Sequence, residues 1–167
     1  MTAERRSPTD GIDRVKVGVA ELAVADGGQR VTTSGLGSCV GVALADPAAE
    51  LAGLAHVMLP ESTDADRKPA KTVAGGIERL LADLEAAGGD PNRFEAKLAG
   101  GSEMFEFSGV GEGVGERNVA RARAELVGRG VPIVAEDVGG SHGRSLELCP
   151  ATWTLTVTSA HEGSEEL

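Results

Sequence analysis

Short runs of alternating apolar and polar residues dominate the chain and predict strands. Residues 15–19 and 153–157 alternate with a period of two, as expected of strands with one buried face. Other short apolar runs are bounded by turn-forming residues, and they predict strands at 30–33, 39–44, 51–58, 94–99, 132–138 and 145–148. The pattern therefore predicts a sheet-rich fold, and it leaves the strand order open.

Two longer stretches have the period of a helix. Between residues 70 and 87 the large apolar side chains fall on one helical face, and Gly88 and Gly89 follow as a stop signal. A second helix is predicted from about residue 116 to residue 128. Helices cover the apolar face of a sheet, so the predicted fold class is α/β: a single sheet-rich layered domain (an α/β sandwich) with two main helices packed on the sheet.

The two ends of the chain are polar, and the middle carries the apolar pattern. We expect residues 1–12 to form a flexible tail, residues 13–159 a single domain, and residues 160–167 an acidic tail. A chain of 167 residues with 41% hydrophobic content is long enough for one substantial core. The first residues lack the apolar segment of a signal peptide, and no run is long enough to span a bilayer. We therefore expect a cytoplasmic protein without direct membrane insertion.

Composition and charge argue against several kinds of partner. Aromatic residues make up only 2% of the chain, which leaves few stacking surfaces for bases, and the net charge of −10 repels phosphate backbones and anionic membranes. We therefore expect no nucleic-acid partner. Only four of the 16 basic residues are Lys, and such an acidic, Lys-poor composition is typical of proteins from halophilic archaea. This composition predicts that low salt destabilises the fold.

A cysteine between glycines is the first candidate for chemistry. Cys39 lies in the stretch G-S-C-V-G, residues 37–41, where small neighbours would admit a substrate to the sulfur. The glycine spacing matches a nucleophile elbow, but an elbow leads from a strand into a helix, and this cysteine opens a strand. A thiol is nucleophilic only as the thiolate, so a catalytic cysteine needs a base. Of the three histidines, His56 is the best placed to supply it.

A predicted hairpin brings these two residues together. Residues 46–49, Asp-Pro-Ala-Ala, suit a type I turn between two strands. A turn centred between Pro47 and Ala48 places Cys39 directly opposite His56 on one face of the hairpin. A bulge at the turn would shift this register, and a slip of one residue would put the two side chains on opposite faces.

Structural roles are the simpler alternatives for these residues and account for the remaining thiol and histidines. Cys39 is alternatively a small buried hydrophobe, and His56 a core histidine with satisfied hydrogen bonds. Cys149 is predicted to be a structural thiol, with no disulfide between the two cysteines. His142 fits a loop or surface position, with a catalytic role as the alternative, and His161 lies in the acidic tail.

Two further motifs carry little functional signal. Residues 109–115, G-V-G-E-G-V-G, predict a flexible loop and lack the spacing of nucleotide-binding loops. The stretch Glu116-Arg117-Asn118 suits ordinary capping at a helix start, with binding of an anion or a partner as the alternative. The sequence shows no Cys and His spacing typical of metal sites, so we expect no metal.

Five short stretches form an ordered set of motifs. They are residues 33–40 (T-S-G-L-G-S-C-V), 56–60 (H-V-M-L-P), 97–105 (K-L-A-G-G-S-E-M-F), 115–118 (G-E-R-N) and 136–144 (E-D-V-G-G-S-H-G-R). Together they resemble the CheD family of chemoreceptor glutamine deamidases, over roughly residues 15–157. Family members usually carry a Lys-Tyr pair before the first helix. This chain has Lys71-Thr72 or Lys68-Pro69 there, a departure that concerns a contact of the missing aromatic and not the catalytic pair.

The resemblance implies an activity and roles for three residues. By it, Cys39 would be the nucleophile, His56 the base and Thr33 the group that orients the imidazole, with the adjacent Thr32 as the alternative. The implied reaction converts glutamine side chains of methyl-accepting chemotaxis receptors to glutamate through a thioester and needs no cofactor. The resemblance also implies a second role, as a partner of CheC-type phosphatases. An adaptor that binds and regulates such a phosphatase is therefore the alternative function, and a cysteine hydrolase of another amide is a third.

Overall fold

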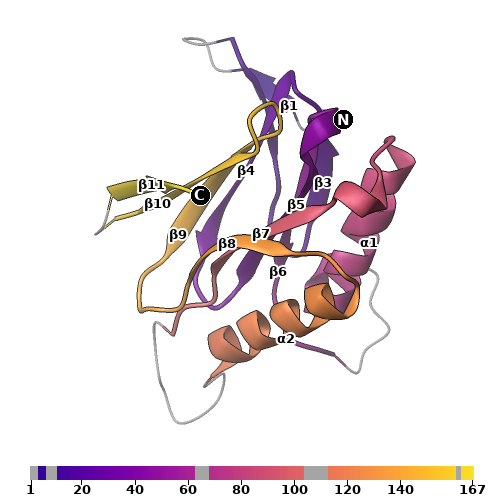
Figure 1. The fold of residues 1–167 in the computed structure, drawn as a ribbon. Helices are drawn as coiled ribbons and strands as arrows, with labels where there is room; N and C mark the ends of the chain where they lie inside the picture. Colours follow the sequence, from indigo (N-terminus) through magenta and orange to yellow (C-terminus); the bar gives the residue numbers. More distant parts are fainter. Residues whose placement is uncertain (1–3, 7–10, 63–67, 104–112, 161–162) are drawn as a thin grey trace.

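Three layers make up the fold: two helices, a central sheet and an outer sheet (Figure 1). The computed structural model describes residues 4–6, 11–62, 68–103, 113–160 and 163–167. The central sheet has the order β3 (Leu22–Ala25), β6 (Leu51–Val57), β5 (Val40–Asp46), β7 (Glu95–Gly100) and β8 (Ile133–Val138). The outer sheet has the order β1 (Glu4–Arg6), β2 (Asp13–Lys16), β4 (Gln29–Leu36), β9 (Arg144–Cys149), β10 (Thr154–Ser159) and β11 (Gly163–Glu166).

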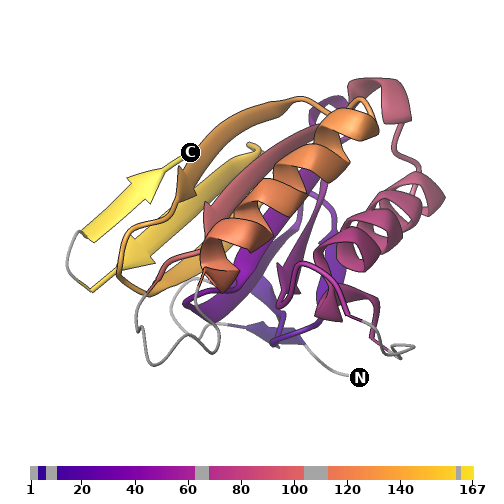
Figure 2. The same ribbon diagram turned by 90° about the horizontal axis from the view of Figure 1, so that it is seen from below.

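The helices α1 (Val73–Ala86) and α2 (Val114–Gly128) lie side by side on one face of the central sheet (Figure 2). Thr72 caps α1, because its side chain accepts a hydrogen bond from the N–H of Gly75 at 3.2 Å. The inward stripe of each helix, including Ile77 and Leu126, is fully buried against the sheet. Both predicted helices are present, and α2 begins two residues before its predicted start. Among the described residues, neither helix has the length and apolar character needed to cross a bilayer.

The other face of the central sheet packs against the outer sheet. Side chains of β5 alternate, so that Val42 and Leu44 face the helices while Ala43 faces the outer sheet. Small residues on this second face let the two sheets approach closely. A Cβ atom on Gly41, for example, would lie 2.4 Å from Cδ1 of Leu146. The strands β5 and β6 are therefore buried on both faces, and the predicted α/β class is confirmed with a second sheet that the sequence pattern did not reveal.

The turn between β5 and β6 is longer than predicted. It consists of the 3₁₀ helix η1 (Pro47–Ala49) followed by Glu50, whose φ of 55° is left-handed. The ladder resumes with Asp46 opposite Leu51, so four residues form the connection in place of two.

This longer turn changes which residues face each other across the hairpin. His56 lies opposite Gly41, and the last pair of the ladder is Val40 with Val57. The predicted direct opposition of Cys39 and His56 is therefore wrong, with the partner of His56 displaced by two positions. Because side chains alternate with a period of two, a shift of two keeps both side chains on the same face of the sheet.

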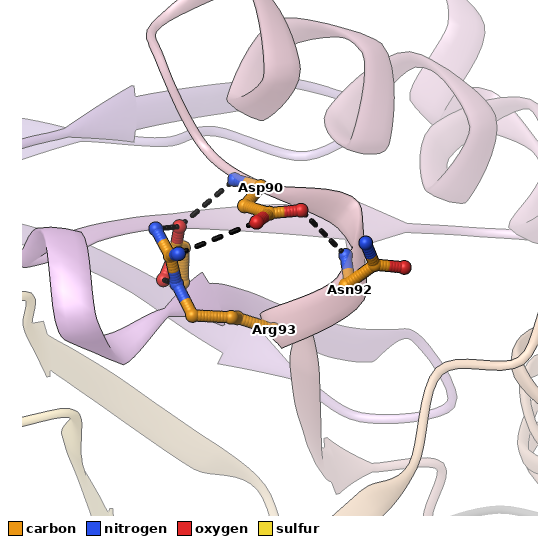
Figure 3. A network of polar contacts seen from close by, with 4 residues as sticks. Asp90, Asn92 and Arg93 are labelled. Atoms are coloured by element: carbon orange, nitrogen blue, oxygen red, sulfur yellow. Dashed lines mark hydrogen bonds and ion pairs between the residues drawn. The ribbon is translucent and has the colours of Figure 1, made fainter.

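A buried carboxylate at the turn of the hairpin binds residues 90–93, the segment that follows α1 (Figure 3). Asp46 accepts hydrogen bonds from Nε and Nη2 of Arg93 at 2.8 and 2.7 Å, and from the N–H of Asp90 at 2.8 Å. The carboxylate of Asp90 in turn accepts from the N–H of Asn92 at 3.0 Å, within the short helix η3 (Pro91–Arg93). The hydrogen bonds from Arg93 lower the pKa of Asp46 to about 2.

Both predicted tails contribute strands to the outer sheet. Residues 4–6 form β1, which pairs with β2, and residues 163–166 form β11, which pairs with β10. Edge strands therefore occur within both stretches predicted as tails, residues 1–12 and 160–167. The side chains of β11 are exposed along its length, so the strand carries no apolar alternation that sequence patterning could detect.

Candidate active site

The loop that carries Cys39 joins the two sheets. Residues 37–39 connect β4 of the outer sheet to β5 of the central sheet. Cys39 is half-buried and packs against the core between the sheets, while its neighbour Ser38 is exposed. The thiol therefore lies at the solvent end of the layer between the sheets, next to an exposed residue of the loop.

Hydrogen bonds hold all three carbonyl groups of this loop. The carbonyl oxygens of residues 37 and 39 accept from the backbone N–H groups of residues 102 and 101, at 2.9 and 2.8 Å. The carbonyl oxygen between them, that of Ser38, accepts from Nδ2 of Asn118 in α2 at 2.8 Å. Three consecutive carbonyls are thus directed toward the protein, which fixes the backbone on either side of the sulfur.

A glycine permits the close approach of β7 to this loop. Gly100 has a φ of 108°, and a Cβ atom at this position would lie 2.5 Å from the carbonyl oxygen of Cys39. Any other residue would be strained in this conformation and would also collide with backbone atoms that cannot move freely. Gly100 therefore brings the following N–H groups within reach of the loop carbonyls.

His56 lies between the sheets, on the same side of the central sheet as Cys39. Its neighbours on β6, Ala52 and Leu54, face the outer sheet, and strand alternation places the imidazole in the same row. The His56 side chain is fully buried. Cys39 packs against this same layer, so the two candidate residues share one face, at diagonal and not opposed positions.

Thr33 fixes the protonation of His56. Oγ1 of Thr33 lies 2.8 Å from Nδ1 of His56 and 2.7 Å from the carbonyl oxygen of Val17. A carbonyl oxygen only accepts, so the single hydroxyl proton goes to Val17 and the hydroxyl oxygen accepts from Nδ1–H. The proton of the neutral imidazole is therefore on Nδ1, and Nε2 carries the lone pair. Among the described residues, Nε2 has no hydrogen-bond partner.

Burial keeps both candidate groups neutral in the resting protein. Burial raises the pKa of the Cys39 thiol, only partly opposed by a hydrogen bond from the backbone of Cys39. Burial also lowers the pKa of His56. Both shifts oppose a standing thiolate and imidazolium pair. The resting arrangement is therefore a neutral thiol and an unprotonated imidazole on the same face of the central sheet.

Similar proteins carry one family name. The profile of the CheD family, described as CheD chemotactic sensory transduction, matches residues 58–159. A Haloarcula marismortui protein named probable chemoreceptor glutamine deamidase CheD is 45% identical over 153 residues, which cover 91% of this chain and 88% of that protein. This chain belongs to the CheD family. A Halalkalibacterium halodurans protein named chemoreceptor glutamine deamidase CheD is 41% identical over 160 residues, which cover 93% of this chain and 99% of that protein.

Solved structures also resemble this chain. A Neisseria meningitidis protein assigned to the DUF152 family aligns with a TM-score of 0.46 and 16% identity, over 77% of this chain and 62% of that chain. The family membership itself rests on the sequence relatives and on the family profile, and it confirms the resemblance seen in the motifs.

In this member of the CheD family, the two adjacent threonines point to opposite sides of the outer sheet. Thr33 is buried between the sheets and contacts His56, whereas Thr32 is only partly buried and follows the opposite alternation on β4. Strand alternation makes the two positions mutually exclusive for contact with the imidazole. Of the two threonines, Thr33 is therefore the one that contacts His56.

The other thiol and histidines lie apart from this cluster or outside the described residues. Cys149 ends β9 and is a free thiol, as is Cys39. Burial works to raise its pKa, but hydrogen bonds from Thr152 and the charge of Arg30 outweigh burial and lower it. His142 lines a separate cavity of about 460 Å³. His161 and residues 109–112 of the predicted glycine-rich loop lie outside the described residues.

The role of Asn118 was not predicted from the sequence. The G-E-R-N stretch was expected to provide ordinary helix capping, with binding of an anion or a partner as the alternative. In the structure Asn118 is fully buried and donates to the Cys39 loop. The signal was present in the spacing, because Asn118 precedes Ala122 and Leu126 by four and eight residues and so lies on the inward face of α2.

Proposed function

We propose that this chain deamidates glutamine side chains of chemotaxis receptors to glutamate, with Cys39 as the nucleophile, His56 as the base and Thr33 as the residue that orients the imidazole. Its relatives are named for that activity. The observation that carries the assignment of residues is the protonation of His56. Thr33 holds the proton on Nδ1, which leaves the lone pair of Nε2 on the face where the thiol packs.

The first half of the reaction forms a thioester. Nε2 of His56 takes the proton of the Cys39 thiol as the sulfur attacks the carboxamide carbon of the glutamine. Backbone N–H groups of the loop around Cys39 stabilise the negative oxygen of the tetrahedral intermediate, and the held carbonyls of this loop fix their direction. The C–N bond then breaks, and ammonia leaves with the proton returned by His56.

The second half consumes water. With ammonia gone, Nε2 of His56 is again unprotonated and accepts a proton from a water molecule that attacks the thioester carbon. Collapse of this second tetrahedral intermediate breaks the C–S bond, and the proton on Nε2 returns to the sulfur. The product is a carboxylic acid, which loses its remaining proton to solvent near neutral pH and becomes glutamate. The receptor therefore gains one negative charge, and each group of the protein returns to its starting state. Besides the glutamine and one water molecule, these steps use side chains and backbone of the chain.

The experiment that tests this proposal uses receptor fragments. Purified protein is incubated with cytoplasmic receptor fragments, and conversion of glutamine to glutamate is mapped by mass spectrometry. We expect conversion with the wild type, none with Cys39→Ala, and full conversion with Cys149→Ala, which removes the other free thiol as a matched control. Conversion that survives in Cys39→Ala would show that the nucleophile is assigned wrongly.

The same experiment separates deamidation from an adaptor role. If the wild type converts no receptor glutamine but binds a CheC-type phosphatase, the adaptor function is correct and the deamidase is not. We further propose that receptors with cytoplasmic signalling domains are the substrates and that the chain acts in the cytoplasm. The deamidation experiment therefore uses cytoplasmic fragments of the receptors.

A further inference from the structure

Asn118 is a fully buried polar residue in the inward face of α2, where its neighbours are Val119, Ala122 and Leu126. Its amide nitrogen Nδ2 donates two hydrogen bonds. Among the described residues, its amide oxygen Oδ1 has no partner although it is buried. An unpaired buried oxygen lowers stability, and a leucine would fill a position of this kind without that cost. Helix packing alone therefore does not explain an asparagine here.

The two acceptors of Asn118 identify what it connects. Nδ2 donates to the carbonyl oxygen of Ser38 at 2.8 Å and to that of Met58 at 2.9 Å. Ser38 directly precedes Cys39, and Met58 follows His56 by two residues. One amide group thus ties the loop of the nucleophile to the strand of the base.

This bridge lies where the hairpin ladder stops. The last pair of β5 and β6 is residues 40 and 57, so the strands no longer bond to each other one step further on. Residues 38 and 58 are held there by the two hydrogen bonds from Asn118. The separation between the end of β6 and the Cys39 loop is therefore set by a side chain of α2.

The first turn of α2 is in turn fixed to the segment that holds the loop from the other side. The carboxylate of Glu103 accepts from the N–H groups of Gly113 and Glu116, at 3.2 and 2.9 Å. A Cβ atom on Gly115 would lie 2.5 Å from the carbonyl oxygens of residues 101 and 102, so the helix backbone packs directly on that segment. The contacts of the first turn of α2 with residues 101–103 therefore hold the helix that carries Asn118 against this segment.

We propose that Asn118 is a positioning residue for the Cys39 and His56 pair. Its two hydrogen bonds set the distance between the thiol and Nε2 of His56 and so control proton transfer between them, although Asn118 itself contacts neither group. The inference rests on the proposed function in that it takes Cys39 and His56 as the reacting pair. It names a third element, α2, as a determinant of their geometry.

The test measures the reactivity of Cys39 without any receptor. Alkylation by iodoacetamide is followed at neutral pH by peptide-resolved mass spectrometry, which separates Cys39 from Cys149. Asn118→Leu keeps a side chain of similar size and removes both donors. Leu126→Ala is the matched control, since it destabilises the same helix without touching the loop. Each variant is also compared in a His56→Ala background, and its folding is checked by circular dichroism and thermal unfolding.

We expect Asn118→Leu to slow alkylation of Cys39 by about 10- to 100-fold, because a misplacement of about 1 Å between reacting groups has effects of this order. In the His56→Ala background the same substitution should change the rate by less than about twofold, since an effect exerted through His56 is lost when His56 is absent. Leu126→Ala should leave the rate within about twofold of wild type while lowering the melting temperature.

Three results would overturn the proposal: an unchanged rate in folded Asn118→Leu, an equal loss with and without His56, or the same loss in Leu126→Ala. Should Asn118→Leu fail to fold, Asn118→Ser replaces it and retains one donor. An intermediate rate that still depends on His56 supports the proposal, and a wild-type rate contradicts it. Failure of the proposed function is distinguishable, because it would appear as absence of receptor deamidation by the wild type, a measurement in which Asn118 is unchanged.

Discussion

Thr33 accepts a hydrogen bond from Nδ1 of His56 at 2.8 Å and donates one from its hydroxyl to the carbonyl oxygen of Val17 at 2.7 Å. This pair of contacts leaves the neutral imidazole one tautomer, with its lone pair on Nε2. The hydroxyl belongs to the outer sheet and the imidazole to the central sheet. The packing of the two sheets therefore determines the chemistry available to His56.

Replacement of Thr33 should impair catalysis while replacement of its neighbour should not. Thr33→Val removes the acceptor for Nδ1–H, so the imidazole loses its fixed tautomer. We expect the turnover number for receptor deamidation to fall by about 100-fold, in the range of general acid–base contributions. Thr33→Ser keeps the hydroxyl and should retain most activity. Thr32→Val is the matched control on the outer face, and equal losses in both valine variants would contradict the assignment.

The pH dependence of Cys39 alkylation should show whether Cys39 and His56 are both neutral in the resting protein. The pKa of Cys39 is raised and that of His56 is lowered, both by burial, so the thiol and the neutral imidazole coexist over the range between them. We expect the alkylation rate of Cys39 to stay on a low plateau in this range and to rise only at higher pH, where the thiol itself ionises. His56→Ala should remove the plateau and leave the rise.

The second thiol supplies an internal comparison for that titration. Hydrogen bonds from Thr152 and the charge of Arg30 outweigh burial at Cys149, so that the net shift of its pKa is downward. Its alkylation should therefore rise at lower pH than that of Cys39 in the same sample. A Cys39 reactivity that titrates below that of Cys149 would mean that the active-site pair is ionised at rest.

Acid should remove the contribution of the buried carboxylate at the hairpin turn. The pKa of Asp46 is about 2 in the folded protein, below an ordinary value of 3.8, because of its hydrogen bonds with Arg93. Its contribution is present above the ordinary pKa and is lost as pH falls through the folded value. We expect Asp46→Asn to lower the free energy of unfolding by about 2 kcal/mol at most near neutral pH, since Arg93 is half exposed.

The measurement for Asp46 is denaturant unfolding at several pH values. The difference between wild type and Asp46→Asn should narrow as pH falls from about 4 to about 2, over which the carboxylate takes up its proton. Asp83→Asn, which alters an exposed pair with Arg79 on α1, is a suitable control and should change stability little. A difference between wild type and Asp46→Asn that stays constant with pH would show that the carboxylate charge is not what holds the turn.

Salt should stabilise the protein. A net charge of −10 on a chain of 167 residues produces repulsion that dissolved ions screen. We expect the melting temperature to rise between about 0.1 M and about 1 M salt, over which the screening length falls from about 10 Å to about 3 Å. The double variant Glu78→Gln and Glu85→Gln removes two exposed charges from α1 and should weaken this dependence. An equally steep dependence in that variant would rule out charge repulsion as its cause.

The sequence was sufficient for the helices but not for the layering. The apolar stripe of α1 predicted its buried face, because an apolar repeat of three to four residues sustained over 14 residues indicates an amphipathic helix. The outer sheet was missed as a separate layer, because an inward row of Leu and Val looks the same whether helices or a second sheet cover it. The edge strand β11 has no buried side chain at all, so no pattern marked it.

The active-site pair shows a similar division between local and non-local information. Alternation along the hairpin was enough to put Cys39 and His56 on one face, but the register depended on Glu50 adopting a left-handed conformation that lengthens the turn. The choice between Thr33 and Thr32 required the position of β4 relative to β6, which lies in another sheet. The bridge from Asn118 likewise joins segments that are 80 and 60 residues away in the chain.

The most direct test of the central claim is to trap the acyl intermediate on the enzyme. A receptor fragment is mixed with excess protein, the reaction is quenched in acid at early times, and the digest is searched for a peptide joined to Cys39. The account predicts a thioester between Cys39 and the target glutamine residue, with the loss of one ammonia, that hydroxylamine cleaves and that Cys39→Ala does not form. Accumulation of receptor glutamate with no acyl group on Cys39 at any time, and at an unchanged rate in Cys39→Ala, would contradict it.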